Sequence, residues 1–474
     1  MLVELRCDSV DRALHGHVHE LMSLHSPSLS SPPRSVSAGA AWWMVAIFLL
    51  TTLISYTDRL VLSVLVDEIR GELRLSDSYV GFLQGPAFTL VYVFAAVAFG
   101  RLTDRRQRKP ILITGVVLWC LAQILCGLAQ NGSVLLVGRL LLGIGEGVLL
   151  PVTFSMIADC FPAKRLGLAN GVLVLGTVVG GPLGITVGGV LLTAAKGGTF
   201  AGWPLIASLA PWRFVLVAMG IAGFVSPLLL LTIREPSRAG ISGVPAEGTL
   251  LYFRSDSSRL WPLYSAMALL SIGDYGLVSW IPTTLSRHFG WAADAVGVTF
   301  GIVTAATGVA GALSGGWLSD FAARRGGVAS RLALSVTAAI FAVVAAAVIC
   351  LGSASLVVIG LGLWVLASTV GAIGAFCVLQ EMMPARVRGT GIALLTFCNT
   401  LIGLGCGPAL VALTTDHVYR LATAVDRSIS TVAVPAGISA CALLLLARHR
   451  LKHPHIGNSD DASSSQTLSE AKSS

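Results

Sequence analysis

Long apolar segments alternate with short polar ones along most of the chain. Twelve apolar runs can be distinguished, and each is close to the roughly 20 residues that a helix needs to cross a bilayer core. Backbone groups in lipid must pair within their own segment, so each run is predicted to be a helix. The short alternating strands of a membrane β-barrel are not part of this pattern. The predicted spans are 41–64, 79–100, 110–129, 133–157, 168–194, 212–233, 260–284, 295–318, 331–352, 355–380, 390–413 and 428–447.

Composition strengthens the membrane interpretation. Apolar residues make up 54% of the 474 positions and charged residues only 12%, against roughly 25% charged in soluble proteins. The mean hydropathy is +0.80. The net charge of +8 could indicate nucleic-acid binding, but the basic residues lie in short loops between apolar runs. That distribution is typical of membrane topology, and nucleic acid is not an expected partner.

The distribution of Lys and Arg predicts the orientation of the chain. The two tails and the even-numbered loops carry 23 of these residues, whereas the odd-numbered loops carry 7. By the positive-inside rule, both tails are therefore expected in the cytoplasm. We expect a multi-pass protein of a bacterial inner membrane.

The two ends of the chain and its cysteines suggest little chemistry. Residues 1–40 are polar and lack the apolar stretch of a signal peptide, and we expect a cytoplasmic tail. His15, His17 and His19 could bind a metal, but a mobile tail is the favoured interpretation. Residues 449–474 are predicted to form a disordered cytoplasmic tail. None of the nine cysteines forms a C-x-x-C pair, so no disulfide, metal site or cofactor is expected.

The chain also repeats itself. The segment GRLTDRRQRKP at 100–110 has a counterpart, GWLSDFAARRG, at 316–326, which is 216 positions later. Such repeats are typical of transporters, whose substrate site lies at the repeat interface near the membrane midplane. We predict an all-α membrane protein with a six-helix bundle at 41–233, a cytoplasmic linker at 234–259 and a second bundle at 260–448. Two further matches follow in the same order, Pro162-Ala163-Lys164 with Pro384-Ala385-Arg386 and Gly181-Pro182 with Gly407-Pro408.

The repeated segment resembles the signature of the major facilitator superfamily between helices 2 and 3. The resemblance implies twelve helices in two bundles related by a pseudo-two-fold axis, and a loop that rearranges during transport. Gly100 would allow close helix contact, Asp104 would accept hydrogen bonds from a helix start, and Arg105 and Arg108 would pair with acids. Asp320 stands in the second copy. The same basic residues could instead serve only to fix topology.

A narrower resemblance points to the spinster-like branch of this superfamily and its bacterial relatives. The organic anion:cation symporter branch has a similar first helix and is the second choice. The segments that carry the resemblance are YTDR (56–59), LSDSYVGFLQGPAFTLVY (75–92), RLLLGIGEG (139–147), MIADCFPAKRLGLANGV (156–172), WRFVLVAMGIAG (212–223), YGLVSWIP (275–282) and NTLIGLGCGP (399–408).

Charged residues inside predicted membrane helices are candidate functional residues, because burying a charge in lipid is costly. Arg139 and Glu146 are seven residues apart on helix 4, so they share a face about 10 Å apart along the axis. They cannot pair directly, but a group from helix 1 could lie between them. Asp58 and Arg59 are adjacent on helix 1 and point about 100° apart. Asp274 on helix 7 is the fifth such residue.

The resemblance assigns roles to the cluster on helices 1 and 4. The spinster-like pattern has Asp-Arg on helix 1 and Arg then Glu on helix 4, which match Asp58, Arg59, Arg139 and Glu146. It implies that Asp58 and Glu146 take up protons, and that both arginines bind an anionic group or tune the acids. Burial disfavours a charged carboxylate and a nearby arginine favours it, which is compatible with that role. A static ion pair between helices 1 and 4 is the alternative.

Other candidates lie in the carboxyl-terminal half and on helix 2. Asp274 departs from the resemblance, because relatives usually have an uncharged residue before Tyr275. It could contact a cation or hydroxyl of a substrate, or face a polar loop if helix 7 breaks at neighbouring glycines. Asn399 and Gln84 could contact substrate or form interhelical hydrogen bonds. The glycines of helix 5, together with Pro182, predict close helix packing and bending.

These features predict a secondary transporter that moves a small organic or amphipathic solute by alternating access, with protons as the expected driving ion. An importer of organic acids such as sugar acids is the alternative within the superfamily. A non-transporting membrane receptor is the alternative from another class, but the tails are short for signalling. The sequence lacks a Walker loop and a grouped nucleophile, His and acid, so an enzyme is not predicted. A monomer in the lipid bilayer is expected.

Overall fold

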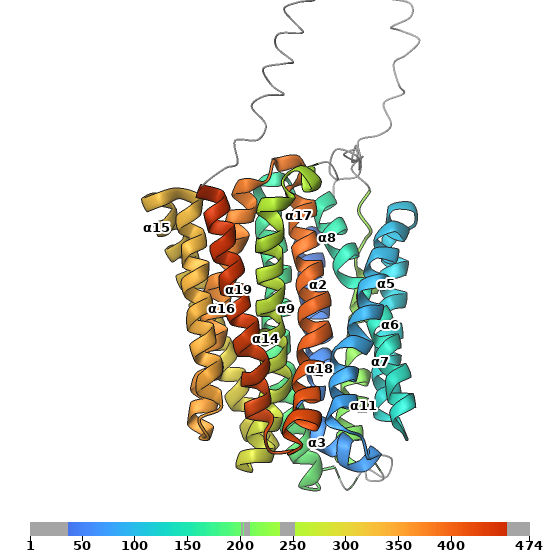
Figure 1. Ribbon diagram of the computed structural model, residues 1–474. Helices are drawn as coiled ribbons and strands as arrows, with labels where there is room; N and C mark the ends of the chain where they lie inside the picture. The colour runs from blue at the N-terminus through green and yellow to red at the C-terminus, as the bar shows by residue number, and fades with distance from the viewer. Residues whose placement is uncertain (1–36, 201, 203–208, 238–251, 453–474) are drawn as a thin grey trace, which may run out of the picture.

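The structure is a computed structural model that describes residues 37–200, 202, 209–237 and 252–452. These residues are almost entirely helical and contain no strand. The predicted tails up to residue 36 and from 453, the histidines at 15, 17 and 19, and most of the linker lie outside the described residues. Figure 1 shows the helices running side by side along one common direction.

Six crossings make up the amino-terminal half. Several are divided into two helices by a short irregularity, for example at Gly85, which separates α4 from α5 in the second crossing. The helices are α2 (Ala38–Leu60), α3 (Leu62–Leu73), α4 (Asp77–Gln84), α5 (Pro86–Arg105), α6 (Arg108–Gly127), α7 (Gly132–Gly147), α8 (Leu149–Cys160), α9 (Ala163–Lys196), α11 (Pro211–Gly223) and α12 (Val225–Thr232).

The carboxyl-terminal half repeats the arrangement with six further crossings. Two of them are contained in the 57-residue α15, and π-helical turns interrupt the crossing that begins with α17. The elements are α14 (Ser257–Phe289), α15 (Ala293–Ile349), α16 (Ala354–Met382), α17 (Ala385–Cys398), η1 (Asn399–Leu404), α18 (Gly405–Leu413), η2 (Thr414–Tyr419) and α19 (Val425–Lys452).

Ten helical segments are long and apolar enough to cross a membrane by composition alone. The difference from the predicted twelve has two causes. The segment α15 contains a non-helical break at Gly326 and Gly327, where the chain reverses, and Gly327 has the positive φ of 63° that glycine tolerates best. The polar residues of α14 keep it out of the ten. The prediction of an all-α membrane protein with twelve crossings in two bundles is confirmed.

Side chains cap several helices at the end of the molecule opposite α19's last residue. The side-chain oxygens of Ser76, Asn131 and Ser353 accept hydrogen bonds from the backbone N–H three residues later, at 3.1, 3.0 and 3.3 Å. Such caps satisfy backbone donors that have no partner inside the helix. Gly290, with a φ of 70°, ends α14 at the same end. We call this the outer end, and the end where α2 begins and α19 finishes the termini end, which is uppermost in Figure 1.

Small residues of α9 allow close packing, as the sequence predicts. A Cβ atom added at Gly180 would lie 2.7 Å from the carbonyl oxygen of Leu53 on α2. The Thr57 hydroxyl donates to the Gly180 carbonyl oxygen at 3.0 Å. The helix continues through Pro182 to Lys196. Backbone-to-backbone contact at this distance requires glycine, so α9 fixes the position of α2 and of the charges that α2 carries.

The two halves are joined mainly toward the outer end. Arg287 on α14 donates to Asp67 on α3 at 2.6 Å and to Asp77 on α4 at 2.8 Å. The backbone N–H and the hydroxyl of Ser78 donate to Asp416 at 2.6 and 2.7 Å. Each of these hydrogen bonds joins a residue of the amino-terminal half to a residue of the carboxyl-terminal half. We call Arg287, Asp67 and Asp77 the outer lock.

Candidate functional site

The centre of the amino-terminal half contains a buried ion pair. Arg59 comes from the last turn of α2 and Glu146 from the end of α7. The Nε and Nη2 atoms of Arg59 both donate to Glu146 Oε2, at 3.1 and 2.5 Å. The side chains are 5% and 0% exposed. Charge-assisted bonds of this kind gain strength where water is excluded, so the pair holds the helices of the first and fourth crossings together.

Arg139 lies on one side of the Arg59–Glu146 pair. It is 2% exposed, and its Nη2 atom donates to the backbone carbonyl oxygen of Arg59 at 3.5 Å. The backbone of α2 thus lies between Arg139 and Glu146, as the seven-residue spacing on helix 4 suggested. Arg139 Nε has no hydrogen-bond partner among the described residues. A buried guanidinium with an unused N–H can donate a hydrogen bond to an additional polar group.

Asp58 points away from Arg59 and meets a different partner. Its Oδ2 atom accepts a hydrogen bond from the indole Nε1 of Trp119 on α6 at 3.2 Å. Asp58 is 1% exposed, and its Oδ1 atom has no partner among the described residues. The two acids therefore differ: Glu146 is neutralised by direct contact with a guanidinium, whereas Asp58 receives a neutral donor.

Aromatic rings surround the Arg59 guanidinium. Its Cζ atom lies 4.4 Å from the ring centroid of Tyr56, and 4.8 Å from the centroids of Phe88 and Tyr92. The rings of Phe88 and Tyr92 stack on each other with centroids 5.5 Å apart. Cation–π attraction holds the guanidinium among them and excludes water from the pair.

Asp274 occupies the corresponding place in the carboxyl-terminal half. It lies on α14, 216 positions after Asp58. The same offset of 216 positions separates the two copies of the repeated loop segment. Its Oδ1 atom accepts a hydrogen bond from the indole Nε1 of Trp364 on α16 at 2.6 Å. The helix α14 runs unbroken through this position, so the predicted alternative of a polar loop at Gly273 and Gly276 is wrong. Tertiary packing keeps both glycines helical.

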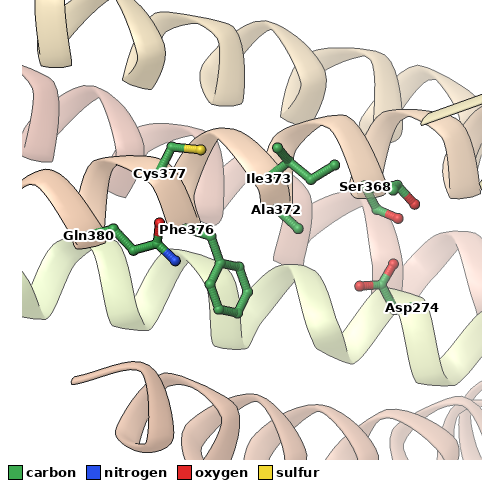
Figure 2. Close-up of a pocket in the computed structure, with 8 residues that line it drawn as sticks. Asp274, Ser368, Ala372, Ile373, Phe376, Cys377 and Gln380 are labelled. Carbon is green, nitrogen blue, oxygen red and sulfur yellow. The ribbon is translucent and has the colours of Figure 1, made fainter. Parts of the chain in front are cut away.

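A cavity of about 360 Å³ opens beside Asp274. Figure 2 shows the carboxylate pointing from α14 toward Ser368 on α16, with Phe376 pointing from α16 back toward α14. Gln380 lines the far end, in the last turn of α16 at the termini end. The other lining residues are Thr369, Ala372, Ile373 and Cys377.

The remaining candidates are scattered around the centre. Tyr275 follows Asp274 and packs against the apolar cluster that contains Phe88 and Tyr92 of the other half. Asn399 begins the π-helix η1, and its Oδ1 atom has no partner among the described residues. Neither polar atom of the buried Gln84 side chain has one either. The predicted interhelical hydrogen bonds of Asn399 and Gln84 are therefore not formed at those atoms.

The repeated loop segment lies at the termini end, remote from the cluster. Arg108 is almost fully buried and donates to Asp159 at 2.5 Å, and Glu235 lies 3.4 Å away. Asp320 is exposed and lies 3.4 Å from Arg331. Arg105 is exposed, and the side chain of Asp104 lies outside the described residues. No described atom of another helix lies within 4 Å of a Cβ placed at Gly100, so the predicted close helix contact is absent in this arrangement.

Three features of the structure were not predicted from the sequence. The indoles of Trp119 and Trp364 are distant in sequence from the acids that they contact, and tryptophan is common in apolar runs. The outer lock joins Arg287, in the last turn of α14, to acids more than 200 positions away. The only signal for it was a set of acidic residues, including Asp67 and Asp77, in a loop predicted to face outward.

Comparison with known proteins agrees with this geometry. The profile of the Major Facilitator Superfamily matches residues 48–408. An MFS-type efflux pump of Mycolicibacterium smegmatis is 27% identical over 80% of this chain and 85% of that protein. The hexuronate transporter of Bacillus subtilis is 25% identical over 79% of this chain and 88% of that protein. A bacterial homolog of the human lysosomal transporter spinster, solved in an inward-facing and unoccupied conformation, has a TM-score of 0.70 at 23% identity, covering 87% of this chain and 96% of that one.

Proposed function

Because the chain belongs to the major facilitator superfamily, whose members are transporters and not enzymes, we propose that it is a proton-coupled secondary transporter of a small organic or amphipathic solute. The observation that carries this proposal is the buried Arg59–Glu146 pair, with Asp58 and Arg139 beside it. Four ionisable groups in the interior of a membrane domain are costly, and such groups mark substrate or proton pathways.

Transport would proceed by alternating access between the two six-helix bundles, 41–233 and 260–448, joined by the linker at 234–259. In this arrangement the outer lock holds the outer end together. Bonds between the halves then break at that end and form at the termini end, where Gly100 and the loop segment could come into contact. We propose that the chain works as a monomer in a bacterial inner membrane, with both termini in the cytoplasm.

Proton binding would couple to this motion through Glu146 and Asp58. A proton on Glu146 removes the charge that holds Arg59 and leaves the guanidinium free to bind an anionic group or a carbonyl. Asp58 is buried and its hydrogen-bond donor, the Trp119 indole, carries no charge, so Asp58 is the second candidate for proton uptake. The two acids would therefore exchange protons with whichever side of the membrane the cavity faces.

An importer of organic acids such as sugar acids is the second candidate, and similarity to a hexuronate transporter favours it. In that case Arg59 and Arg139 would bind the substrate carboxylate. Against it, the Arg59 guanidinium already has a carboxylate partner in Glu146. The predicted spans of the carboxyl-terminal half contribute an acid and no further arginine or lysine away from their ends.

A ligand-induced thermal-shift screen on purified protein tests the function. It would compare organic acids, lipids and organic cations at pH 5.5 and 7.5, in wild type, Glu146→Gln and the control Glu381→Gln, whose side chain is 44% exposed. We expect one class to stabilise the wild type in a pH-dependent manner, and Glu146→Gln alone to remove that dependence. If ligands stabilise all three proteins equally at both pH values, Glu146 is structural and the coupling mechanism is wrong.

A further inference from the structure

Asp274 is an isolated charge in the carboxyl-terminal half. No other acidic or basic residue stands in the interior of the predicted spans of that half. Among the described residues, no Lys, Arg or His side chain forms an ion pair with it. Its partner is the indole of Trp364, which donates a hydrogen bond but carries no charge. An unpaired carboxylate in a membrane interior is costly and needs a compensating cation or proton.

In the amino-terminal half, buried carboxylates are accompanied by buried arginines. Asp58 stands at the equivalent position of the repeat and also accepts an indole N–H, from Trp119. There, however, two carboxylates share the interior with the guanidiniums of Arg59 and Arg139, so the charges balance. The carboxyl-terminal half keeps the acid and lacks the bases. Among the described residues, the interior of the membrane domain therefore has one more acidic than basic side chain, and the excess acid is Asp274.

The cavity beside Asp274 has the shape of an elongated slot. Its lining residues on α16 run from Ser368 to Gln380, twelve positions or about 18 Å along the helix. The carboxylate lies at one end and the amide of Gln380 at the other (Figure 2). Between them the lining is apolar, with Ala372, Ile373 and Phe376. Its volume of about 360 Å³ lies in the range of small-molecule pockets.

We propose that this slot binds an amphipathic organic cation, whose protonated amine pairs with Asp274 and whose apolar body lies along Ile373 and Phe376. The proposal rests on the proposed transport function, for which it names the substrate class. Trp364 holds Oδ1 and thereby orients the carboxylate, while the ammonium supplies the missing positive charge. A hydroxyl compound of the same shape would fill the slot but leave the charge uncompensated, so it binds more weakly.

Three molecules with one skeleton provide the test: 4-phenylbutylamine, 4-phenylbutan-1-ol and 4-phenylbutyrate. Their dissociation constants would be measured at pH 7.5 on the full-length protein in lipid nanodiscs. We expect the amine to bind at least about tenfold more tightly than the alcohol, as a charge-assisted hydrogen bond implies, and more tightly still than the acid. Similar affinities for amine and alcohol would mean that Asp274 is neutral, and would overturn the proposal, as would an absence of binding by the amine.

Two variants test whether the preference for the amine depends on Asp274. Asp274→Asn removes the charge but keeps an oxygen that can accept the Trp364 indole N–H. We expect it to lose at least about tenfold in amine affinity and to keep the alcohol affinity within about twofold. Glu381→Gln removes a charge from the last turn of the same helix, outside the slot, and should leave all three affinities unchanged. Equal amine binding by wild type and Asp274→Asn would refute the assignment.

Flux measurements separate this inference from the proposed function. Efflux of the labelled amine would be followed in proteoliposomes with an imposed proton gradient. Binding that depends on Asp274 without any flux of the amine would leave the slot assigned and contradict transport of this class. Proton-driven flux of another solute, with amine binding unaffected by Asp274→Asn, would support the transporter and overturn the slot.

Discussion

At Arg59, a single guanidinium meets one carboxylate and three aromatic rings in the interior of a membrane protein. The residue before it, Asp58, faces a different helix because neighbours on a helix point about 100° apart. Two adjacent residues therefore form two separate contacts, an ion pair with Glu146 and a hydrogen bond with an indole. The sequence indicated this separation, and the structure identifies Glu146 and Trp119 as the partners.

Removing one partner of the Arg59–Glu146 pair should lower the free energy of unfolding more than removing both partners. Arg59→Met leaves a buried carboxylate without its partner and should lower the free energy of unfolding by about 3 kcal/mol. Adding Glu146→Gln removes the orphaned charge, so the double variant should recover more than half of the loss. The measurement is denaturation of the purified protein by SDS in bicelles. Additive losses in the double variant would contradict a direct pair.

Trp119 should orient Asp58 through its indole N–H. Trp119→Phe keeps most of the apolar volume but leaves the second oxygen of a buried carboxylate without a donor, which costs about 1–3 kcal/mol. The same SDS titration would measure this loss. Asp58→Asn in the same background should reduce the effect, since the amide is uncharged. An unchanged stability in Trp119→Phe would show that the hydrogen bond at 3.2 Å contributes nothing.

At the scale of elements, the contact between α9 and α2 fixes where the charged cluster stands. Glycines of α9 meet the backbone of α2 at Leu53 and Thr57. Because Asp58 and Arg59 follow directly on α2, a shift of this helix would move both side chains relative to α7. Small residues on one helix are thus a condition for the ion pair on another.

A bulky side chain on this face of α9 should therefore disturb the site from a distance. Gly180→Leu would force α2 away and should destabilise the protein by about 1–3 kcal/mol, with loss of the pH-dependent stabilisation expected of wild type. The matched control is Gly171→Leu on the same helix, where a Cβ meets no described atom within 4 Å. Thermal unfolding with and without ligand would compare them. Equal effects at both positions would exclude packing against α2 as the cause.

At the scale of the whole molecule, the two halves touch most closely at the outer end. The outer lock places Arg287 between Asp67 and Asp77, and Ser78 with Asp416 adds a second connection. Rigid bundles that are tied at one end can separate at the other, which is the geometry that alternating access requires. The relative stability of the two arrangements then depends on a few polar contacts between the bundles.

Removal of the lock should shift the molecule toward an arrangement open at the outer end. In Arg287→Ala on a cysteine-free background, spin labels at Arg74 and Leu421, which are exposed and lie on different halves, should show a larger population of long distances. The matched control is Arg213→Ala, whose ion pair with Glu72 lies within one half. Indistinguishable distance distributions in the two variants would mean that the lock does not hold the outer end closed.

The sequence alone determined the membrane environment, the twelve crossings, the duplication and the charged residues of the site. These features follow from local patterns: apolar runs of a fixed length, repeated segments, and charges where lipid makes them costly. The prediction of a major facilitator transporter is confirmed because the signature segment and its second copy are local as well. The roles of Asp58, Glu146 and the arginines remain predictions.

Only the tertiary structure decided which groups meet. The pairing of Arg59 with Glu146, the indoles on Asp58 and Asp274, the outer lock and the slot beside α16 all join residues distant in the chain. Spacing on one helix gives the face on which a side chain stands, but not the helix that packs against that face. The close approach of helices through small residues makes that choice, and it also kept α14 unbroken at Asp274.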